Sequence, residues 1–348
     1  MNFASDNWAG VHPKIAESLH RHSTGFVPAY GASDLDKSVE RTFRDIFECD
    51  LSVYFVATGT AANALSLASF NKPGGITFCH QSAHVAEDEC GAVEYLTGGS
   101  RLSLVPGAHG KMDVAALEKA IAKNPAAFVH GGQPMGITIT QVTEAGTVHT
   151  LPELSAISAL AKTNNLPLHM DGARFANALV SLGCTPADMT WKSGVDILSF
   201  GGTKNGCWCA EAIVVFNKEL DAQMPFLRKR AAQLFSKSRF IAAQFEGYFA
   251  EDLWLANARH ANAMASRLSE ILDASGRAKL YGTPQANEVF AVINKATIED
   301  IRNSGAVFYD WHSPSDVILD KEASMVRFVT NFATSAGDVD GLSLLLNT

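Results

Sequence analysis

The chain has 348 residues, more than a single hydrophobic core usually holds, so we expect a large domain and a smaller one. Apolar residues make up 47% of the sequence and charged residues 18%, a composition that excludes disordered and fibrous proteins. The formal net charge of −8 and the lack of a long Lys/Arg run argue against nucleic acid as a partner.

Short runs rich in β-branched and aromatic residues alternate with amphipathic segments over the first two thirds of the chain. The predicted strands are, in chain order, 51–57, 75–80, 127–131, 166–171, 196–202 and 211–217. Between them lie predicted helices over 61–70, 114–123 and 151–164. This alternation predicts an α/β fold with a mostly parallel central sheet flanked by helices. Ligands of such sheets bind beyond the carboxyl ends of the strands.

The character of the sequence changes in its last third. Residues 226–274 have an almost entirely helical pattern and predict a bridge out of the large domain. Residues 280–348 then show short strands (EVFAVI, AVFYDW, MVRFVT) around a helix that begins near Thr297, which predicts a smaller C-terminal α+β domain. We expect an N-terminal arm (1–25) packed on the small domain, a large domain (26–250) and the small domain itself (251–348).

We expect a cytoplasmic protein without a membrane partner. No window approaches about 18 uninterrupted apolar residues, and the opening MNFASDNWAG has no signal-peptide pattern. The six cysteines have no framework spacing, so we interpret them as thiols. Cys207-Trp208-Cys209 lacks a second Cys/His pair nearby, and we predict no metal site.

The most informative stretches are HMDGARFANALV and SFGGTKNG. Asp171 ends one predicted strand, and Lys204 follows the next one, just past two glycines. An enzyme that uses pyridoxal 5'-phosphate (PLP) needs this pair: a lysine amine to bind the cofactor covalently, and a carboxylate to keep the pyridine nitrogen protonated. The glycines around Thr203 leave room for a flat ring against the backbone. A lone aspartate here would suggest a helix cap and a lone lysine a surface residue, but the two together favour the PLP interpretation.

Two further strand ends fit the same cofactor. In ATGTAANALSLA, the residues Thr58, Gly59 and Thr60 lead from a strand into a helix, whose free amides favour a phosphate. The alternative for this turn is an ordinary capped helix start. His84 comes just after another strand, a position from which an imidazole can stack on the cofactor ring; a lone histidine is more commonly structural or exposed.

Taken together, these motifs resemble those of a known enzyme family. The segments that carry the resemblance span nearly the whole sequence: FASDNWAG, AYGASD, ATGTAANALSLA, CHQSAHVAEDECGAVE, ITQVTEAGTVHTL, HMDGARFANALV, SFGGTKNGCWCAEAIVVF, RKRAAQLFSKSRF and MVRFVTNFATS. They resemble the low-specificity L-threonine aldolases and the related phenylserine aldolases. The resemblance implies a fold-type I PLP-dependent, transferase-like enzyme.

The resemblance implies roles for individual residues at the cofactor. Lys204 would be the Schiff-base lysine, and Asp171 would contact the pyridinium nitrogen. His84 would stack on the ring, and Thr203 would lie beside it in the lysine loop. The remaining cofactor contacts would be Gly59 and Thr60 at the phosphate, Arg174 near the ring hydroxyl, and Arg239 reaching the phosphate of a neighbouring subunit.

It also implies roles at the substrate. Arg327 would be the main clamp on the substrate carboxylate, with Arg174 beside it. Ser5 would be a polar residue near the site, and His130 a second active-site histidine near the substrate hydroxyl. The group that removes the β-hydroxyl proton stays open among His84, His130 and a held water.

The implied reaction is retro-aldol cleavage of L-threonine, L-allo-threonine or a related β-hydroxy-α-amino acid such as phenylserine to glycine and an aldehyde. Two segments depart from many family members, AAQLFSKS before Arg239 and ITQVTEAGTVHTL, and the first resembles the phenylserine-type branch. The preferred substrate therefore stays open. The resemblance also implies a homodimer or homotetramer with shared active sites.

Three alternative functions remain open from the sequence. The first is another PLP lyase that eliminates a leaving group from Cβ. The second is a zinc hydrolase built on His169, Asp171, Cys207 and Cys209. The third is a protein that carries PLP for binding or regulation without catalysis.

Overall fold

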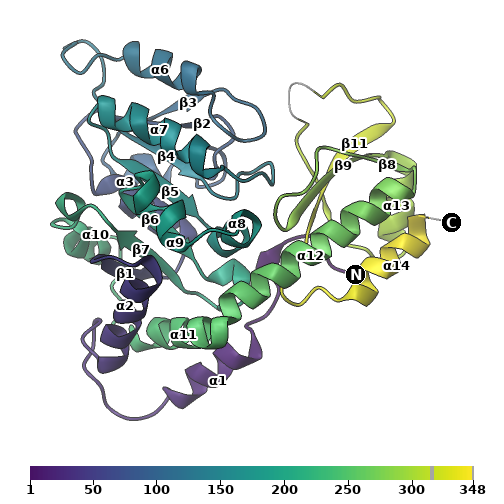
Figure 1. The fold of residues 1–348 in the computed structure, drawn as a ribbon, viewed down its shortest axis with the longest axis horizontal. Helices are drawn as coiled ribbons and strands as arrows, with labels where there is room; N and C mark the ends of the chain where they lie inside the picture. The colour runs from purple at the N-terminus through teal and green to yellow at the C-terminus, as the bar shows by residue number, and fades with distance from the viewer. Residues whose placement is uncertain (314–316, 347–348) are drawn as a thin grey trace.

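The computed structural model describes residues 1–313 and 317–346, and its centre is a seven-stranded sheet (Figure 1). The strands lie in the order β1-β7-β6-β5-β4-β2-β3. Only β7 is antiparallel to its neighbours, β1 and β6, so the predicted mostly parallel α/β sheet is confirmed. The strands are β1 Ser52–Val56, β2 Ile76–His80, β3 Arg101–Val105, β4 Pro134–Thr140, β5 Leu168–Gly172, β6 Ile197–Gly201 and β7 Glu211–Val215.

Helices cover both faces of this sheet because alternate residues of its strands point to opposite sides. In β6, Ile197 packs with α3 and α10, whereas Leu198 and Phe200 pack with the helices of the other face. The helices of this part are α1 Pro13–Arg21, α2 Asp34–Phe47, α3 Gly59–Ala68, α4 His84–Glu87, α5 Ala92–Leu96, α6 Val114–Ala122, α7 Leu151–Thr163, α8 Phe175–Leu182, α9 Pro186–Met189, α10 Met224–Arg230 and α11 Arg239–Phe249.

An aromatic cluster supports the end of β6. The ring of Phe200 lies 5.3 Å from that of Phe43, 6.0 Å from that of Phe245 and 6.0 Å from that of Trp254, centroid to centroid. Phe200 is fully buried. Because close-packed side chains leave little room for displacement, the cluster gives the loop after β6 a rigid base.

The smaller part contains a four-stranded antiparallel sheet in the order β10-β11-β9-β8, which confirms the predicted C-terminal α+β unit. Its elements are β8 Ala278–Leu280, β9 Glu288–Asn294, α13 Lys295–Asn303, β10 Tyr309–Asp310, β11 Ala323–Val329 and α14 Ala336–Leu346. Helix α12 (Leu253–Ala274) runs from the large sheet to the small one and packs against α8 and α11 as well as α14 and β9 (Figure 1).

The N-terminal segment touches both parts. Asn2 forms a bridge with Val307, and Phe3 packs against Phe328 of the small sheet. A 3-10 turn (η1, Asp6–Trp8) follows, and α1 then packs on α11 of the larger part. Our expected arm therefore contacts the small domain through its first residues, and α1 lies on the large one. The domain boundaries at residues 25 and 250 stay a prediction.

The predicted strand at 127–131 is wrong. Residues 127–130 form a turn in which Phe128 and Val129 are exposed, and the strand is β4, a few residues later. The apolar run misled the prediction because it is short. In β4, the hydroxyls of Thr138 and Thr140 bond to His169 and Glu144. We also did not predict β3, an edge strand of the sheet, although its sequence RLSLV alternates polar and apolar residues over its first four positions. No helix of the described segments is long and apolar enough to cross a membrane.

Candidate active site

Several predicted site residues gather where the parallel strands of the large sheet end, an edge that we call the carboxyl edge. Thr58 follows β1, His84 follows β2, Asp171 lies near the end of β5, and Lys204 follows β6. The antiparallel β7 contributes its first residue, Glu211, to the same edge. Parallel strands bring their ends together whatever the sequence distance between them, so four predicted site residues meet there.

Two donors hold the carboxylate of Asp171, which is buried. Its Oδ2 accepts a hydrogen bond of 2.8 Å from Nδ2 of Asn63 on α3, and its Oδ1 accepts one of 3.0 Å from the backbone N–H of Ala173. Both bonds fix the direction of the carboxylate at the strand end. Sequence reasoning did not single out Asn63, which lies inside a helix of small residues.

A chain of hydrogen bonds connects Asp171 to His84. The same Asn63 amide bonds to Oε1 of Glu89 at 2.8 Å, and that oxygen lies 2.9 Å from Nδ1 of His84. The Glu89 carboxylate accepts, so Nδ1 carries the hydrogen and Nε2 of a neutral ring is left as the acceptor. The hydrogen bond that His84 donates to Glu89 also raises the pKa of His84. Glu89 therefore sets the tautomer and the orientation of the imidazole.

The loop that carries Lys204 is pressed against its neighbours. A Cβ on Gly201 would lie 2.5 Å from the carbonyl oxygen of Ala173, and one on Gly202 would lie 2.7 Å from that of Ala210. Only glycine fits these two close approaches. The loop continues as a 3-10 turn (η3, Thr203–Asn205), in which Lys204 is half-buried.

Thr203 and Glu211 fasten this turn to β7. The backbone N–H of Thr203 donates to Oε1 of Glu211 at 3.3 Å, and the Thr203 hydroxyl accepts from the Ala210 N–H at 3.3 Å. Burial raises the pKa of Glu211 to about 7, although the bond with Thr203 and the charge of Lys204 oppose the shift. Sequence reasoning missed Glu211.

The N-terminus of α3 opens onto the same edge. The Thr58 hydroxyl caps it by accepting from the N–H of Ala61 at 3.2 Å, and Gly59 and Thr60 form its first turn. A Cβ on Gly59 would meet nothing within 4 Å, so the turn has open space in front of it. Free amides and the helix dipole favour an anion at such a position.

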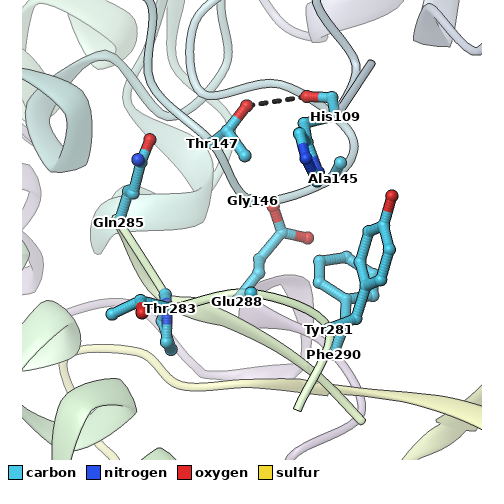
Figure 2. A pocket seen from close by; sticks show the side chains of 11 residues that line it. His109, Ala145, Gly146, Thr147, Tyr281, Thr283, Gln285, Glu288 and Phe290 are labelled. Atoms are coloured by element: carbon cyan, nitrogen blue, oxygen red, sulfur yellow. Dashed lines mark hydrogen bonds between the residues drawn. The ribbon is translucent and has the colours of Figure 1, made fainter. Parts of the chain in front are cut away.

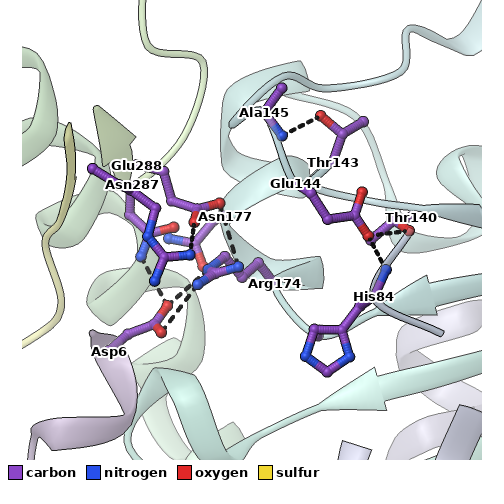
Figure 3. A network of polar contacts seen from close by, with 12 residues as sticks. Asp6, His84, Thr140, Thr143, Glu144, Ala145, Arg174, Asn177, Asn287 and Glu288 are labelled. Carbon is purple, nitrogen blue, oxygen red and sulfur yellow. Dashed lines mark hydrogen bonds and ion pairs between the residues drawn. The ribbon is translucent and has the colours of Figure 1, made fainter. Parts of the chain in front are cut away.

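A cluster of two arginines and two carboxylates lies where the N-terminal segment meets both sheets (Figure 3). Arg174 donates from Nε to Asp6 at 2.8 Å and from Nη2 at 3.1 Å, and its Nη1 lies 3.3 Å from Oε2 of Glu288. Burial opposes the charges of both Asp6 and Arg174, but their mutual attraction outweighs it, lowering the pKa of Asp6 and raising that of Arg174. Arg174 is thus largely occupied by protein carboxylates, a feature that the sequence did not reveal.

Arg327 is the more available of the two arginines. Its Nη1 lies 3.5 Å from Oε1 of Glu288, its guanidinium stacks 3.8 Å from the centre of the Trp311 ring, and its buried Nε has no hydrogen-bond partner. Burial lowers the pKa of Arg327, and Glu288 counteracts this. An orphaned donor beside a stacked, planar guanidinium is suited to a carboxylate ligand.

Glu144, which we did not predict, lies beside His84 (Figure 3). Its Oε1 accepts from the backbone N–H of His84 at 2.7 Å and from the Thr140 hydroxyl at 2.9 Å. Its Oε2 is shielded from solvent and has no hydrogen-bond partner. Burial raises the pKa of Glu144 to about 7.

A cavity of about 260 Å³ adjoins these residues, between the loop after β4 and the small sheet (Figure 2). Ala145 and Gly146 form one wall, and Tyr281 and Phe290 belong to the other. Glu288 lines the cavity as well, so the cavity reaches the cluster of Arg174, Arg327, Asp6 and Glu288. Its mixed aromatic and polar lining fits a small organic group.

Three predicted site residues, His130, Ser5 and Arg239, either lie away from the carboxyl edge or bond to the protein itself. His130 precedes β4, at the end of that strand opposite the carboxyl edge, and its ring is exposed beside Phe128; the expectation that it lies near the substrate is corrected. Ser5 caps η1 by accepting from the N–H of Asn7. Arg239 donates to the carbonyls of Thr24 and Gly25 at 3.3 and 3.0 Å.

The residues of the zinc alternative have other partners. His169 is fully buried, with Nδ1 2.8 Å from the Thr138 hydroxyl and Nε2 2.9 Å from that of Ser199. Burial lowers its pKa to about 4. Over residues 1–313 and 317–346, no three His, Cys, Asp or Glu side chains are arranged to hold a metal ion.

Comparison with known proteins agrees with this geometry. A low specificity L-threonine aldolase of a Pseudomonas species is 41% identical over 307 residues, which is 88% of each chain, and one of Pseudomonas aeruginosa is 42% identical over the same shares. The structure of a threonine aldolase from Leishmania major superimposes with a TM-score of 0.91 at 28% identity, covering 99% of this chain and 98% of that one. The family model described as beta-eliminating lyase matches residues 2–296, and the resemblance stated from the motifs is confirmed: the chain belongs to the beta-eliminating lyase family.

Proposed function

We propose that this protein is a PLP-dependent carbon–carbon lyase of the threonine aldolase type. It cleaves L-threonine, L-allo-threonine or a related β-hydroxy-α-amino acid, such as phenylserine, to glycine and an aldehyde. The observation that carries the proposal is the meeting of the Lys204 loop, Asp171 and His84 at one edge of the sheet. The two Pseudomonas relatives, which are 41% and 42% identical over 88% of this chain, support it.

The residues present fit the cofactor. Lys204 supplies a primary amine for its aldehyde carbon, and Asp171 offers a fixed carboxylate for its ring nitrogen. The uncovered amides at Gly59 and Thr60 are suited to its phosphate. His84, held by Glu89, provides a flat ring to stack on it. When bound, pyridoxal 5'-phosphate supplies an electron sink for the bond that breaks at Cα.

Arg327 binds and orients the substrate carboxylate. The stack on Trp311 holds the plane of its guanidinium, and its unpartnered Nε adds a donor in that plane. Arg174 assists by keeping Glu288 in place, since Glu288 contacts both arginines. A carboxylate held at this point lets the enzyme choose which bond of Cα stands perpendicular to the cofactor ring. For cleavage, that bond is Cα–Cβ.

The cavity between the loop after β4 and the small sheet takes the substituent on Cβ. It shares Glu288 with the arginine cluster, so a substrate bound by Arg327 extends into it. Phe290 and Tyr281 line it and suit a methyl group or an aromatic ring. This accommodates both threonine and phenylserine.

Elimination of a leaving group from Cβ is the second candidate, because the matching family is described as beta-eliminating lyase. Such a reaction would use the same Lys204 and Asp171. It needs a leaving group at Cβ and an acid that protonates it. Incubation with tyrosine and a test for released phenol separates the two candidates.

We also propose an oligomer, a homodimer or homotetramer, in which Arg239 reaches the phosphate of a neighbouring subunit. Support comes from its position at the start of α11 and from its contacts, which within residues 1–313 and 317–346 are two backbone carbonyls and the Phe240 ring and include no carboxylate. We propose a cytoplasmic location as well. All six cysteines are thiols, as is usual in a reducing compartment.

The experiment is a visible spectrum of the purified protein, followed by assays for glycine and aldehyde. We expect a yellow protein, and borohydride should bleach it and leave the cofactor attached to Lys204, located by peptide mass spectrometry. Lys204→Ala should lose this attachment and turnover. A protein that stays colourless after incubation with the cofactor, or that releases no glycine from threonine or phenylserine, would contradict the proposal.

A further inference from the structure

The reaction needs a group that accepts the proton of the β-hydroxyl, and Glu144 is placed for it. It comes from the loop between β4 and α7, next to the cavity wall formed by Ala145 and Gly146. Its carboxylate points toward His84 (Figure 3). It therefore contacts the backbone of His84, and the residue after it in the chain, Ala145, lines the cavity that takes the Cβ substituent.

The two oxygens of Glu144 have different surroundings. Oε1 accepts two hydrogen bonds, from the His84 N–H and from the Thr140 hydroxyl, which fix the carboxylate. Oε2 is shielded from solvent and has no partner. A buried polar atom without a partner is costly unless a ligand satisfies it. A substrate hydroxyl is such a ligand.

The groups around Glu144 set its charge. The negative charge of Asp171 on β5 disfavours the ionised form of Glu144. The ionised Glu144 in turn stabilises the positive charge of Arg174. The thiol of Cys79 on β2 is a further titratable neighbour. Burial is the largest influence and raises the pKa of Glu144 to about 7, the range in which a carboxylate is an efficient general base at neutral pH. The bond to Glu89 raises the pKa of His84 as well, and it holds a hydrogen on Nδ1 of the ring.

We infer that Glu144 is the catalytic base of the cleavage step, with Oε2 accepting the proton of the substrate β-hydroxyl. In that step the Cα–Cβ bond breaks and its electron pair stays with Cα, where the cofactor would supply the electron sink. The Cβ–O bond becomes a carbonyl, and the hydroxyl proton passes to Glu144. The aldehyde then leaves, Cα takes up a proton to give glycine, and Glu144 loses its proton to solvent. This inference rests on the proposed function.

Glu144→Gln in the cofactor-loaded enzyme tests it, because the amide oxygen still accepts from His84 and Thr140 but cannot take a proton. We expect threonine cleavage to fall by about 10²–10⁴-fold, the usual contribution of a general base. Exchange of the glycine α-hydrogen with deuterated water, followed by NMR, should persist, because glycine has no β-hydroxyl. Glu94→Gln is the matched control, since Oε2 of Glu94 is likewise buried and without a partner, and it should cleave threonine like the wild type.

A second readout does not depend on turnover. Infrared difference spectra of the wild type and of Glu94→Gln should show the carboxyl groups of Glu144 and Glu211 titrating near neutral pH, and Glu144→Gln should lose the first signal and keep the second. Glu144→Ala should regain cleavage when formate is added, because a small carboxylate can fill the vacated space. If Glu144→Gln folds poorly, the formate rescue of Glu144→Ala still tests the inference.

Three results would overturn the inference: wild-type cleavage by Glu144→Gln, equal loss of cleavage and glycine exchange, or no rescue of Glu144→Ala by formate. The second result would mean that Glu144 only positions His84. Failure of the proposed function is a separate outcome, since in that case the wild-type enzyme itself releases no glycine from β-hydroxy amino acids.

Discussion

The carboxylate of Asp6 and the guanidinium of Arg174 form a two-point ion pair, at 2.8 and 3.1 Å, across 168 residues of sequence. Both side chains are nearly inaccessible to solvent, so each charge depends on the other. Asn287, which immediately precedes β9 of the small sheet, donates to Oδ2 of Asp6 at 3.1 Å. Through Arg174 and Asn287, Asp6 therefore connects the N-terminal segment to both parts of the molecule, beside the proposed substrate site.

Replacing Asp6 by Asn should destabilise the protein by about 3–5 kcal/mol, because it leaves the Arg174 charge buried without its main partner. Urea unfolding followed by circular dichroism measures this loss. Asp340→Asn is the matched control: it removes an Asp–Arg pair with Arg267 that is about half exposed, and such pairs contribute about 0–1 kcal/mol. Equal effects of the two substitutions would show that the Asp6 pair is not a structural link.

Replacing Arg327 by Ala should leave the visible spectrum of the bound cofactor unchanged and reduce kcat/KM for threonine. Loss of a charge-assisted hydrogen bond corresponds to roughly tenfold to a hundredfold. Arg327→Lys should rescue poorly, since an ammonium cannot reproduce the planar donors of the guanidinium. Arg302→Ala, which removes an exposed pair with Asp310, serves as the control. If kcat/KM stays unchanged for both threonine and phenylserine, Arg174 becomes the next candidate for the clamp.

The buried His169 should make stability depend on pH. Its pKa is lowered from 6.5 to about 4 in the folded chain, so the unfolded chain binds the proton more readily between these values. The stabilisation is complete above pH 6.5 and is lost as the pH falls toward 4, by up to roughly 3 kcal/mol. His169→Gln should reduce the dependence of the unfolding free energy on pH over this range, and a remaining part should come from His149, whose pKa burial also lowers to about 4. His20→Gln, at an exposed position on α1, should keep the wild-type slope.

Arg239→Ala should weaken retention of the cofactor if the arginine serves a neighbouring phosphate. Dialysis followed by absorption measures this, with the exposed Arg41→Ala as control. Mixing Arg239→Ala with Lys204→Ala subunits should restore part of the activity, because a hybrid contains one site with both residues intact. A fully active monomer in solution would refute the shared site.

Much of the site was predictable from the sequence. The strands that carry Asp171 and precede Lys204, the glycines of the lysine loop and the helix start at Thr58 each depend on a few consecutive residues. Periodicity, capping and turn preferences are local properties, so a single sequence reveals them. The parallel order of strands then implied that their ends share one edge. The family motifs contain these same local units.

The other half of the site depended on the tertiary structure. Glu89, Glu144, Glu211 and Glu288 looked like ordinary charged residues in the sequence, whereas His130 looked like part of the site and lies at the opposite end of its strand. What distinguishes the glutamates is their surroundings: Glu144 meets His84 across 60 residues, and Glu288 meets Arg174 and Arg327. Burial and opposite charges determine whether a carboxylate is a base, a partner or a surface group. Distant elements supply both, so only the folded chain decided which glutamates belong to the site.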